Sequence, residues 1–275
     1  MNGSLVIFLL AAGFGTRLRP YTDQWPKCLM PINGRPLLEY WLNMAKLASA
    51  RAVLVNLHYL SETVAVFLKR QVFKNWVQAV YEPELKGTAG ALCANYEKLQ
   101  NATVMLVHAD NYCDCDLENF IEFHFTQRPK NCVITMMVFN TQNPSSCGIV
   151  ELDQNDVVVG FHEKIDNPPG NLANGAVYLI EPEVLDWIYS REDVVDFSTQ
   201  VLPHFIGRIA AWRNTGIHVD IGSIEALRNV QSLPLRDMSL LDSVDDDWAK
   251  NFASHPIHQQ IQCGVHFQNG DKENK

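Results

Sequence analysis

The chain has 275 residues, of which 47% are hydrophobic and 19% are charged, and its formal net charge is −9. That length and balance indicate a soluble globular protein with one large domain, or one domain and an extension. The acidic charge argues against a nucleic-acid partner. The apolar runs stop short of the roughly 20 residues of a membrane helix, and the N-terminus lacks the basic start of a secretory signal. We therefore expect a cytoplasmic protein without a membrane contact.

The cysteines do not indicate a disulfide framework or a zinc site. There are seven of them, an odd number with scattered spacing, which is typical of reduced thiols. Cys113 and Cys115 stand at the wrong interval for the usual zinc knuckle, and no second pair matches them.

Strand-like and helix-like segments alternate in the first half of the chain. This pattern is typical of a mostly parallel sheet with helices on both faces, so we expect a Rossmann-like α/β domain with a mixed sheet. The predicted strands cover residues 5–10, 52–57, 77–81 and 103–107. The predicted helices cover residues 36–47, 61–70, 88–99 and 117–125.

The second half is richer in strands and ends in a polar tail. Its β-rich stretch favours a mixed sheet or hairpin insert, with strands over residues 132–139, 148–152, 157–161 and 175–180. Helices over residues 182–190, 197–206 and 223–231 follow. We find no internal repeat and no hexapeptide periodicity of a β-helix. We expect a main domain over residues 1–232 and an irregular extension over residues 233–275, in which residues 243–252 form a short helix carrying Trp248 or belong to a frayed tail.

The segment after the first predicted strand is rich in glycine and cations. Gly13 and Gly15 let main-chain N–H groups come close to a phosphate, because glycine adopts backbone angles closed to other residues. Arg17 offers a planar fork for two polyphosphate oxygens, whereas Lys27 offers a compact charge for one phosphoryl group. The loop lacks the third glycine of a dinucleotide fingerprint and the Gly-Lys-Ser/Thr of a Walker loop, so an ordinary tight turn is the alternative.

Two distant aspartates, Asp110 and Asp220, each stand where a strand ends. Two carboxylates in such places suggest Mg²⁺, which takes hard oxygen ligands completed by water and substrate phosphates. A single aspartate there is more often a helix cap or turn former. His108 is interpreted as a structural histidine.

The glycine-rich segment resembles the signature of the sugar-1-phosphate nucleotidyltransferases, the enzymes that make nucleotide sugars. The matching residues are Gly13, Gly15, Thr16, Arg17, Leu18, Arg19, Pro20, Thr22, Pro26, Lys27, Leu29, Pro31, Gly34, Pro36 and Leu37. Residues 107–110 and 220–222 resemble the two metal motifs of that family, with Ala109 in place of a usual glycine. The resemblance covers roughly residues 5–231. It implies an Mg²⁺-dependent enzyme with Asp110 and Asp220 as metal ligands and with Arg17 and Lys27 as catalytic residues.

Residues 81–90 resemble the nucleobase loop of the same family. Glu82 stands where relatives that use pyrimidines tend to carry glutamine, and a carboxylate only accepts hydrogen bonds. Guanine presents two donors along one edge, so Glu82 favours GTP; a solvated loop charge is the alternative. The implied nucleotide contacts are Leu10, Ala12, Gly13, Gly15, Thr16, Glu82, Gly87 and Thr88.

Residues 161–164 and 174–175 resemble the sugar-side motifs. The resemblance implies that Glu163 accepts hydrogen bonds from sugar hydroxyls and that Lys164 holds the sugar phosphate, although Ile165 stands where the family commonly has proline. Two adjacent surface charges are the alternative. The implied sugar-phosphate contacts are Asn111, Gly148, Glu163, Lys164 and Asn174.

The resemblance implies transfer of a nucleotidyl group from a nucleoside triphosphate to a sugar 1-phosphate, with GTP and mannose 1-phosphate as the first choice. One alternative is a uridylyl- or thymidylyltransferase that uses heptose, N-acetylmuramic acid or glucose 1-phosphate. Another is a non-catalytic regulatory relative that binds a nucleotide sugar. The expected partners are the two substrates, and a homodimer is left open.

Overall fold

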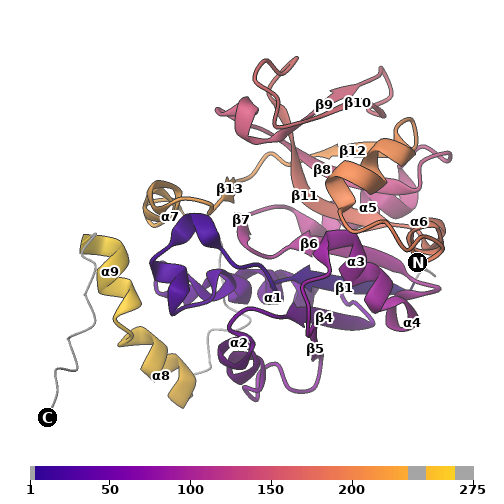
Figure 1. The fold of residues 1–275 in the computed structure, drawn as a ribbon. Helices are drawn as coiled ribbons and strands as arrows, with labels where there is room; N and C mark the ends of the chain where they lie inside the picture. The colour runs from indigo at the N-terminus through magenta and orange to yellow at the C-terminus, as the bar shows by residue number, and fades with distance from the viewer. Residues whose placement is uncertain (1–3, 235–245, 264–275) are drawn as a thin grey trace, which may run out of the picture.

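The computed structural model describes residues 4–234 and 246–263, and among these residues nine strands form one mixed sheet (Figure 1). Its main path runs in the spatial order β10 (Val158–Glu163), β9 (Gly148–Leu152), β11 (Leu172–Ile180), β6 (Thr103–His108), β1 (Leu5–Leu10), β4 (Ala52–Leu57) and β5 (Val77–Tyr81). Beside this path, β8 (Ile134–Asn140) pairs with β11 and with β12 (Ile209–Arg213).

β1 is the centre of the parallel half of the sheet. It lies between β4 and β6, and Leu10 at its end stands opposite Asn56 on β4 and His108 on β6. All six residues of β1 are buried, as expected for a parallel strand covered on both faces. Because the carboxyl ends of parallel strands meet at one edge of a sheet, the loops after β1, β4 and β6 gather there.

The other half of the sheet is largely antiparallel. β11 runs antiparallel to both β6 and β8, and β10 runs antiparallel to β9. The predicted mixed sheet over residues 132–180 is therefore confirmed, and so is the predicted α/β class.

Helices cover both faces of the sheet. The helices α1 (Leu37–Leu47), α2 (Ser61–Leu68) and α5 (Leu117–Thr126) pack on the face to which Ile7 and Leu9 point. The helices α3 (Gly87–Ala94), α4 (Tyr96–Leu99) and α6 (Pro182–Tyr189) pack on the face to which Val6 and Phe8 point. Since successive residues of a strand point to opposite faces, β1 contributes to both apolar cores.

Two short ladders lie outside the large sheet. β7 (Asn111–Cys113) pairs antiparallel with β13 (His218–Asp220), and β2 (Pro31–Ile32) pairs with β3 (Arg35–Pro36). Of these four strands, only one ending at Asp220 was expected; the other three were not predicted, because segments of two or three residues carry no measurable periodicity. β12 was also not predicted, and its two alanines have low strand propensity.

Two predicted helices differ from the structure. The helix predicted over residues 88–99 is interrupted at Asn95, whose side chain donates to the Ala91 carbonyl at 2.9 Å. The regular helix predicted over residues 197–206 is wrong: Phe197–Val201 forms a π-helical turn and Leu202–Phe205 a 3-10 turn. Pro203 explains this difference, because it has no N–H to donate and its ring crowds the preceding turn.

The C-terminal helices pack against the main body, beyond α7 (Ile224–Val230), and are yellow in Figure 1. α8 (Asp247–Ala253) carries Trp248, whose ring lies 4.8 Å from that of Phe67. α9 (Ile257–Cys263) was not predicted; it buries Ile257 and Ile261 against the segment that follows the glycine loop. α8 corresponds to the helix predicted over residues 243–252, of which residues 243–245 lie outside the described part. Within residues 4–234 and 246–263, none of the helices has the length and apolar character needed to cross a bilayer.

Candidate active site

The glycine loop leaves β1 at the edge where the parallel strands end. The Leu10 carbonyl accepts a hydrogen bond from the Ala109 N–H at 3.0 Å, and Ala12 is buried. Gly13 lies where an added Cβ would meet no atom within 4 Å, so this side of the loop is open. The loop closes with a 3-10 turn that begins at Thr16.

Gly15 allows this loop to pack against the residue that carries the predicted phosphoryl contact. It has a φ of +62°, and a Cβ there would lie 2.9 Å from the Thr22 methyl carbon and 3.1 Å from Lys27 Cβ. A residue other than glycine would be strained in this left-handed conformation and would also push the turn away from Lys27.

Arg17, Lys27, Asp110 and Asp220 come together in one group, which we call the phosphate-side cluster. Lys27 Nζ lies 2.8 Å from Asp110 Oδ2 and 3.5 Å from Asp220 Oδ1. The Arg17 guanidinium lies 3.1 Å from Asp220 Oδ2. Residues separated by about two hundred positions in the chain therefore meet around one ammonium group.

The β7–β13 ladder explains why the two aspartates meet. Asp110 directly precedes β7, and the register of the ladder sets Asp220 opposite Asn111. The Asn111 carbonyl also accepts a hydrogen bond from Trp41 Nε1 at 2.8 Å, which ties β7 to α1. At the turn after Asp220, a Cβ on Gly222 would collide with the Arg17 guanidinium, so this glycine leaves room for the arginine.

The exposure of the cluster is graded from the inside to the outside. The Lys27 side chain is 6% exposed and the Arg17 side chain is 68% exposed. Burial acts to raise the pKa of Asp110, but the charge and the hydrogen bond of the Lys27 ammonium, together with a backbone hydrogen bond, outweigh it, and the pKa of Asp110 is held below its usual value. Asp110 is therefore ionised at neutral pH and neutralises the buried ammonium of Lys27.

His108 is neutral. Burial lowers its pKa, and its Nε2 atom is buried without a hydrogen-bond partner among the described residues. The carboxylates of Asp110, Asp196 and Glu163 act to raise its pKa, but burial outweighs them.

The two aspartates fit a magnesium ion in their chemistry. They present carboxylate oxygens that reach one common ammonium group, so one small cation is within reach of both. In the part of the chain that the structure describes, no group of three or more His, Cys, Asp or Glu residues is arranged to hold a metal. A pair of carboxylates suits Mg²⁺, which keeps several waters and substrate phosphates among its ligands, better than it suits a metal that needs an all-protein cage.

The predicted nucleobase residues are engaged by the protein itself. Glu82 is 3% exposed and accepts a hydrogen bond from Asn56 Nδ2 at 3.0 Å, so the alternative of a solvated loop charge is wrong. A Cβ on Gly87, whose φ is +75°, would collide with the Val195 carbonyl oxygen. The Thr88 hydroxyl accepts from the Phe197 N–H at 2.7 Å. Each of these residues therefore has a packing role in addition to the predicted one.

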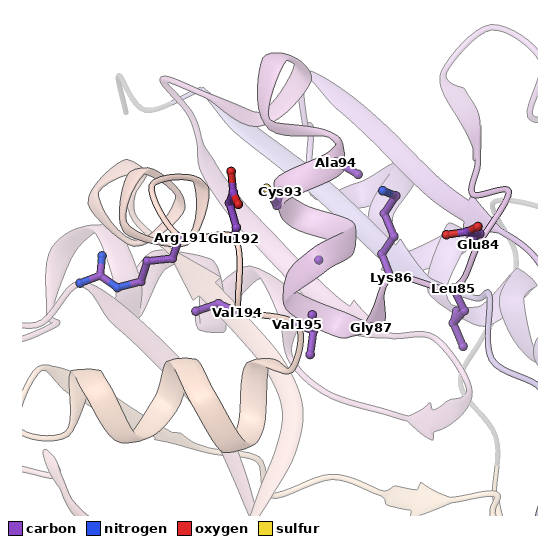
Figure 2. Close-up of a pocket in the computed structure, with 11 residues that line it drawn as sticks. Glu84, Leu85, Lys86, Gly87, Cys93, Ala94, Arg191, Glu192, Val194 and Val195 are labelled. Atoms are coloured by element: carbon purple, nitrogen blue, oxygen red, sulfur yellow. The ribbon is translucent and has the colours of Figure 1, made fainter.

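A pocket of about 630 Å³ lies along α3, on the side of the segment that precedes Phe197 (Figure 2). Gly87 is on its border, and the cations Lys86 and Arg191 contribute to its wall. None of the four residues of the phosphate-side cluster lines it, so it is separate from that cluster.

Of the five predicted sugar-side residues, four lie in or directly after strands of the antiparallel half of the sheet, and Asn111 lies apart from them in β7. A Cβ on Gly148 would lie 2.6 Å from Glu163 Oε2, so this glycine makes room for the carboxylate. Lys164 has a φ of +50°, and its ammonium pairs with Glu163 at 3.0 Å. Asn174 donates to the Tyr178 hydroxyl at 2.6 Å and accepts from the N–H of Ala176 at 2.9 Å. Asn174 thus supports an irregularity in the pairing of β11 with β8.

The fold has the form of those α/β proteins in which the loops after parallel strands bind ligands. The sequence model of the family described as "Nucleotidyl transferase" matches residues 6–235, and the chain belongs to that family. The resemblance seen in the motifs is confirmed at this level.

Three curated proteins are similar in sequence to most of this chain. A mannose-1-phosphate guanylyltransferase of Mycobacterium tuberculosis is 29% identical over 239 residues, which cover 82% of this chain and 66% of that protein. The mannose-1-phosphate guanylyltransferase catalytic subunit beta of Drosophila melanogaster is 29% identical over 227 residues, covering 80% of this chain and 60% of that protein. A UTP–glucose-1-phosphate uridylyltransferase of Synechocystis is 25% identical over 255 residues, covering 84% of this chain and 65% of that protein. The chain thus spans less than two thirds of the length of each of these relatives.

Two polar residues near these motifs were not singled out from the sequence. Asn56 is buried at the end of β4, and Tyr178 is buried in β11. Asn56 had a readable signal, because it is a polar residue in an otherwise apolar strand. Tyr178 had none, because a tyrosine in a strand is ordinary core.

Proposed function

We propose that the protein transfers a nucleotidyl group from a nucleoside triphosphate to a sugar 1-phosphate and releases pyrophosphate. The observation that supports this proposal most directly is the meeting of Arg17 and Lys27 with Asp110 and Asp220 at the end of the parallel strands. In this reaction a phosphate oxygen that is already anionic attacks the α-phosphorus, so no protein nucleophile is required. The protein has to bring two polyanions together and stabilise the charge that develops between them.

The roles follow from the position of each charge. Lys27 is the buried cation, and it binds the phosphoryl group that is transferred. Arg17 is the exposed cation at the rim, and its fork binds the departing pyrophosphate. The main-chain N–H groups of the loop from Leu10 to Thr16, at Ala12, Gly13 and Gly15, line the triphosphate.

Asp110 and Asp220 are the residues that would hold Mg²⁺. When bound, the ion supplies a positive charge against the α-phosphate oxygens. Until then, Lys27 and Arg17 neutralise the two carboxylates, so the site exchanges protein ion pairs for contacts with the substrate. We assign the catalytic function to residues 1–232 and regard residues 233–275 as an extension.

On the sugar side, we assign the sugar 1-phosphate to the region of Asn111, Gly148, Glu163, Lys164 and Asn174. Glu163 accepts hydrogen bonds from sugar hydroxyls, in the space that Gly148 leaves open. Lys164 supplies charge to the sugar phosphate.

GTP and mannose 1-phosphate are the substrates we propose first. Two of the relatives described above are mannose-1-phosphate guanylyltransferases, and the acceptor-only carboxylate of Glu82 matches the donor edge of guanine. The relative from Synechocystis, named as a UTP–glucose-1-phosphate uridylyltransferase, makes the pair of UTP and glucose 1-phosphate the second candidate.

The experiment is a matrix of four nucleoside triphosphates against mannose, glucose, heptose and N-acetylmuramic acid 1-phosphates, with Mg²⁺, read by pyrophosphate release. The proposal predicts release, with the highest kcat/KM for GTP and mannose 1-phosphate. Highest release with another pair would correct the substrates and leave the reaction in place. Binding of nucleotide or nucleotide sugar without any release would instead identify a non-catalytic relative.

A further inference from the structure

Asn56 joins two segments that lie far apart in the chain. Its Oδ1 atom accepts the Ala11 N–H at 2.6 Å, at the start of the glycine loop. Its Nδ2 atom donates to Glu82 Oε1 at 3.0 Å, at the start of the predicted nucleobase loop. Asn56 and Glu82 are each 3% exposed, so water does not compete for either bond.

The orientation of the Asn56 amide is fixed by its neighbour. The Ala11 N–H can only donate, so the oxygen of the amide must face it and the NH₂ group must face Glu82. Glu82 therefore uses Oε1 to accept from Asn56. Its other oxygen, Oε2, faces the N–H of Lys86 at 3.5 Å, a long and weak hydrogen bond, and keeps capacity to accept another donor.

We propose that Asn56 is a positioning residue for nucleobase selection. By holding Oε1 of Glu82, it leaves Oε2 as the atom that accepts hydrogen bonds from the base. Because it also accepts from Ala11, it fixes the position of the nucleobase loop relative to the glycine loop. The inference rests on the proposed function, since it requires a nucleotide between these loops. It identifies the preferred base by its chemistry, as one whose edge donates hydrogen bonds, such as guanine.

The test exchanges donor and acceptor across this pair and measures dissociation constants for GTP and UTP by calorimetry without sugar phosphate. In Glu82→Gln, the amide oxygen must still accept from Asn56, so an NH₂ group replaces Oε2. We expect the affinity ratio of GTP to UTP to fall by about tenfold or more. In Asn56→Asp, two carboxylates face each other, Glu82 is displaced, and the ratio falls by a similar factor.

The double variant Asn56→Asp/Glu82→Gln should restore the ratio. The carboxylate introduced at position 56 would still accept from Ala11 and would now accept from the NH₂ group of the new glutamine, which turns the amide oxygen to the position of Oε2. The pair also regains its original total charge. A residue with a purely structural role would not give this reciprocal rescue.

Asn95→Asp is the matched control, because Asn95, which follows α3, is also a buried asparagine but donates to the Ala91 carbonyl instead of to Glu82. It should lower the melting temperature and leave the GTP to UTP ratio unchanged. In turnover assays, Asn56→Asp should raise KM for GTP by about tenfold and leave kcat within about threefold.

Three results would overturn the inference: a wild-type protein that binds GTP and UTP equally, an Asn56→Asp variant with the wild-type ratio, or a double variant without rescue. Failure of the proposed function has a different signature, namely no pyrophosphate release by the wild-type protein with any substrate pair. The binding ratios still test Asn56 in that case.

Discussion

The side chains of the phosphate-side cluster differ in their contacts from those of a second region, the predicted nucleobase and sugar-side residues. In the cluster, the charged atoms of Arg17, Lys27, Asp110 and Asp220 face one another across segments that are distant in sequence. In the second region, the polar atoms of residues such as Thr88 and Asn174 are bonded to nearby backbone or to buried neighbours. Motif residues of one family can therefore present charge to a ligand or shape the backbone around it.

This contrast has an energetic consequence. Charges that neutralise one another can be exchanged for substrate charges, so their removal should affect turnover first. Side chains that hold the backbone cannot be exchanged in this way, so their removal should affect stability and position first.

Lys27→Ala is expected to have the largest effect on turnover. It removes the only cation that contacts both aspartates among the described residues, and we expect kcat to fall about a hundredfold or more, the scale of losing a key electrostatic contact. Pyrophosphate release measures the loss, and circular dichroism verifies the fold. Lys46→Ala serves as the control, because it removes a lysine of α1 whose ammonium lies over the ring of Trp76. Near-normal turnover in a folded Lys27→Ala protein would place the reaction elsewhere.

Arg17→Ala should have a smaller effect, of about tenfold in kcat, or about 1.4 kcal/mol. The guanidinium is 68% exposed, so solvent screens much of its charge. Arg17→Lys keeps the charge without the planar fork, so its kcat should lie between those of the wild-type protein and Arg17→Ala. A loss as large as that of Lys27→Ala would contradict the graded arrangement, because both cations would then act at the reacting phosphate.

His124 provides a comparison outside the site. Burial lowers its pKa, although Glu181 lies 2.8 Å from Nε2 and acts to raise it; Arg128 and the hydroxyl of Thr135 are the other groups at this site. The unfolded chain takes up a proton at the usual pKa of about 6.5, whereas the folded protein resists it, so stability falls as pH drops below that value. His124→Gln removes this proton. Urea unfolding between pH 7.5 and 5 should show a pH slope that is shallower by up to about 1.4 kcal/mol per pH unit, with normal turnover at pH 7.5. An unchanged slope would mean that the folded histidine titrates normally.

Ala176→Gly should produce the smallest change, and it should be stabilising. Ala176 has a φ of +53°, in the irregular part of β11 that Asn174 supports. A left-handed conformation costs a residue with a Cβ roughly 1–2 kcal/mol, and glycine removes this cost. Glycine also makes the unfolded chain more flexible, which offsets part of the gain. We therefore expect the free energy of unfolding, measured by thermal unfolding, to rise by about 0.5–1 kcal/mol. Ala173→Gly, in the same strand without a positive φ, should instead destabilise. Loss of stability in Ala176→Gly would show that this conformation is not strained.

The sequence predicted most of the fold and the charges of the candidate site. Apolar runs such as residues 5–10 and 103–107 define buried parallel strands, and a cationic loop after the first of them is bound to lie at the carboxyl edge of the sheet. Lys27 and Asp110 could therefore be expected in the same place. The resemblance of short motifs to a known family supplied Asp220.

What could not be predicted depends on contacts between distant segments. Asp220 reaches Asp110 through a ladder of two three-residue strands, which have no periodicity to read. The hydrogen bonds of Asn174 accompany an irregular register between β11 and β8, which appears only when these two strands are paired. Asn56 could have been noticed in its apolar strand, but its two partners are 45 and 26 residues away.

In the proposed reaction, Asp110 and Asp220 act as one unit toward the same Mg²⁺-bound triphosphate. The most direct measurement is a double-mutant cycle of Asp110→Asn and Asp220→Asn, in which Mg²⁺-dependent kcat/KM is determined for the wild-type protein, each single variant and the double variant. The effects of removing two ligands of one ion are not additive. The kcat/KM of the double variant should therefore be little lower than that of the more impaired single variant. Losses that multiply would mean that the two carboxylates act independently, and the shared site would have to be abandoned.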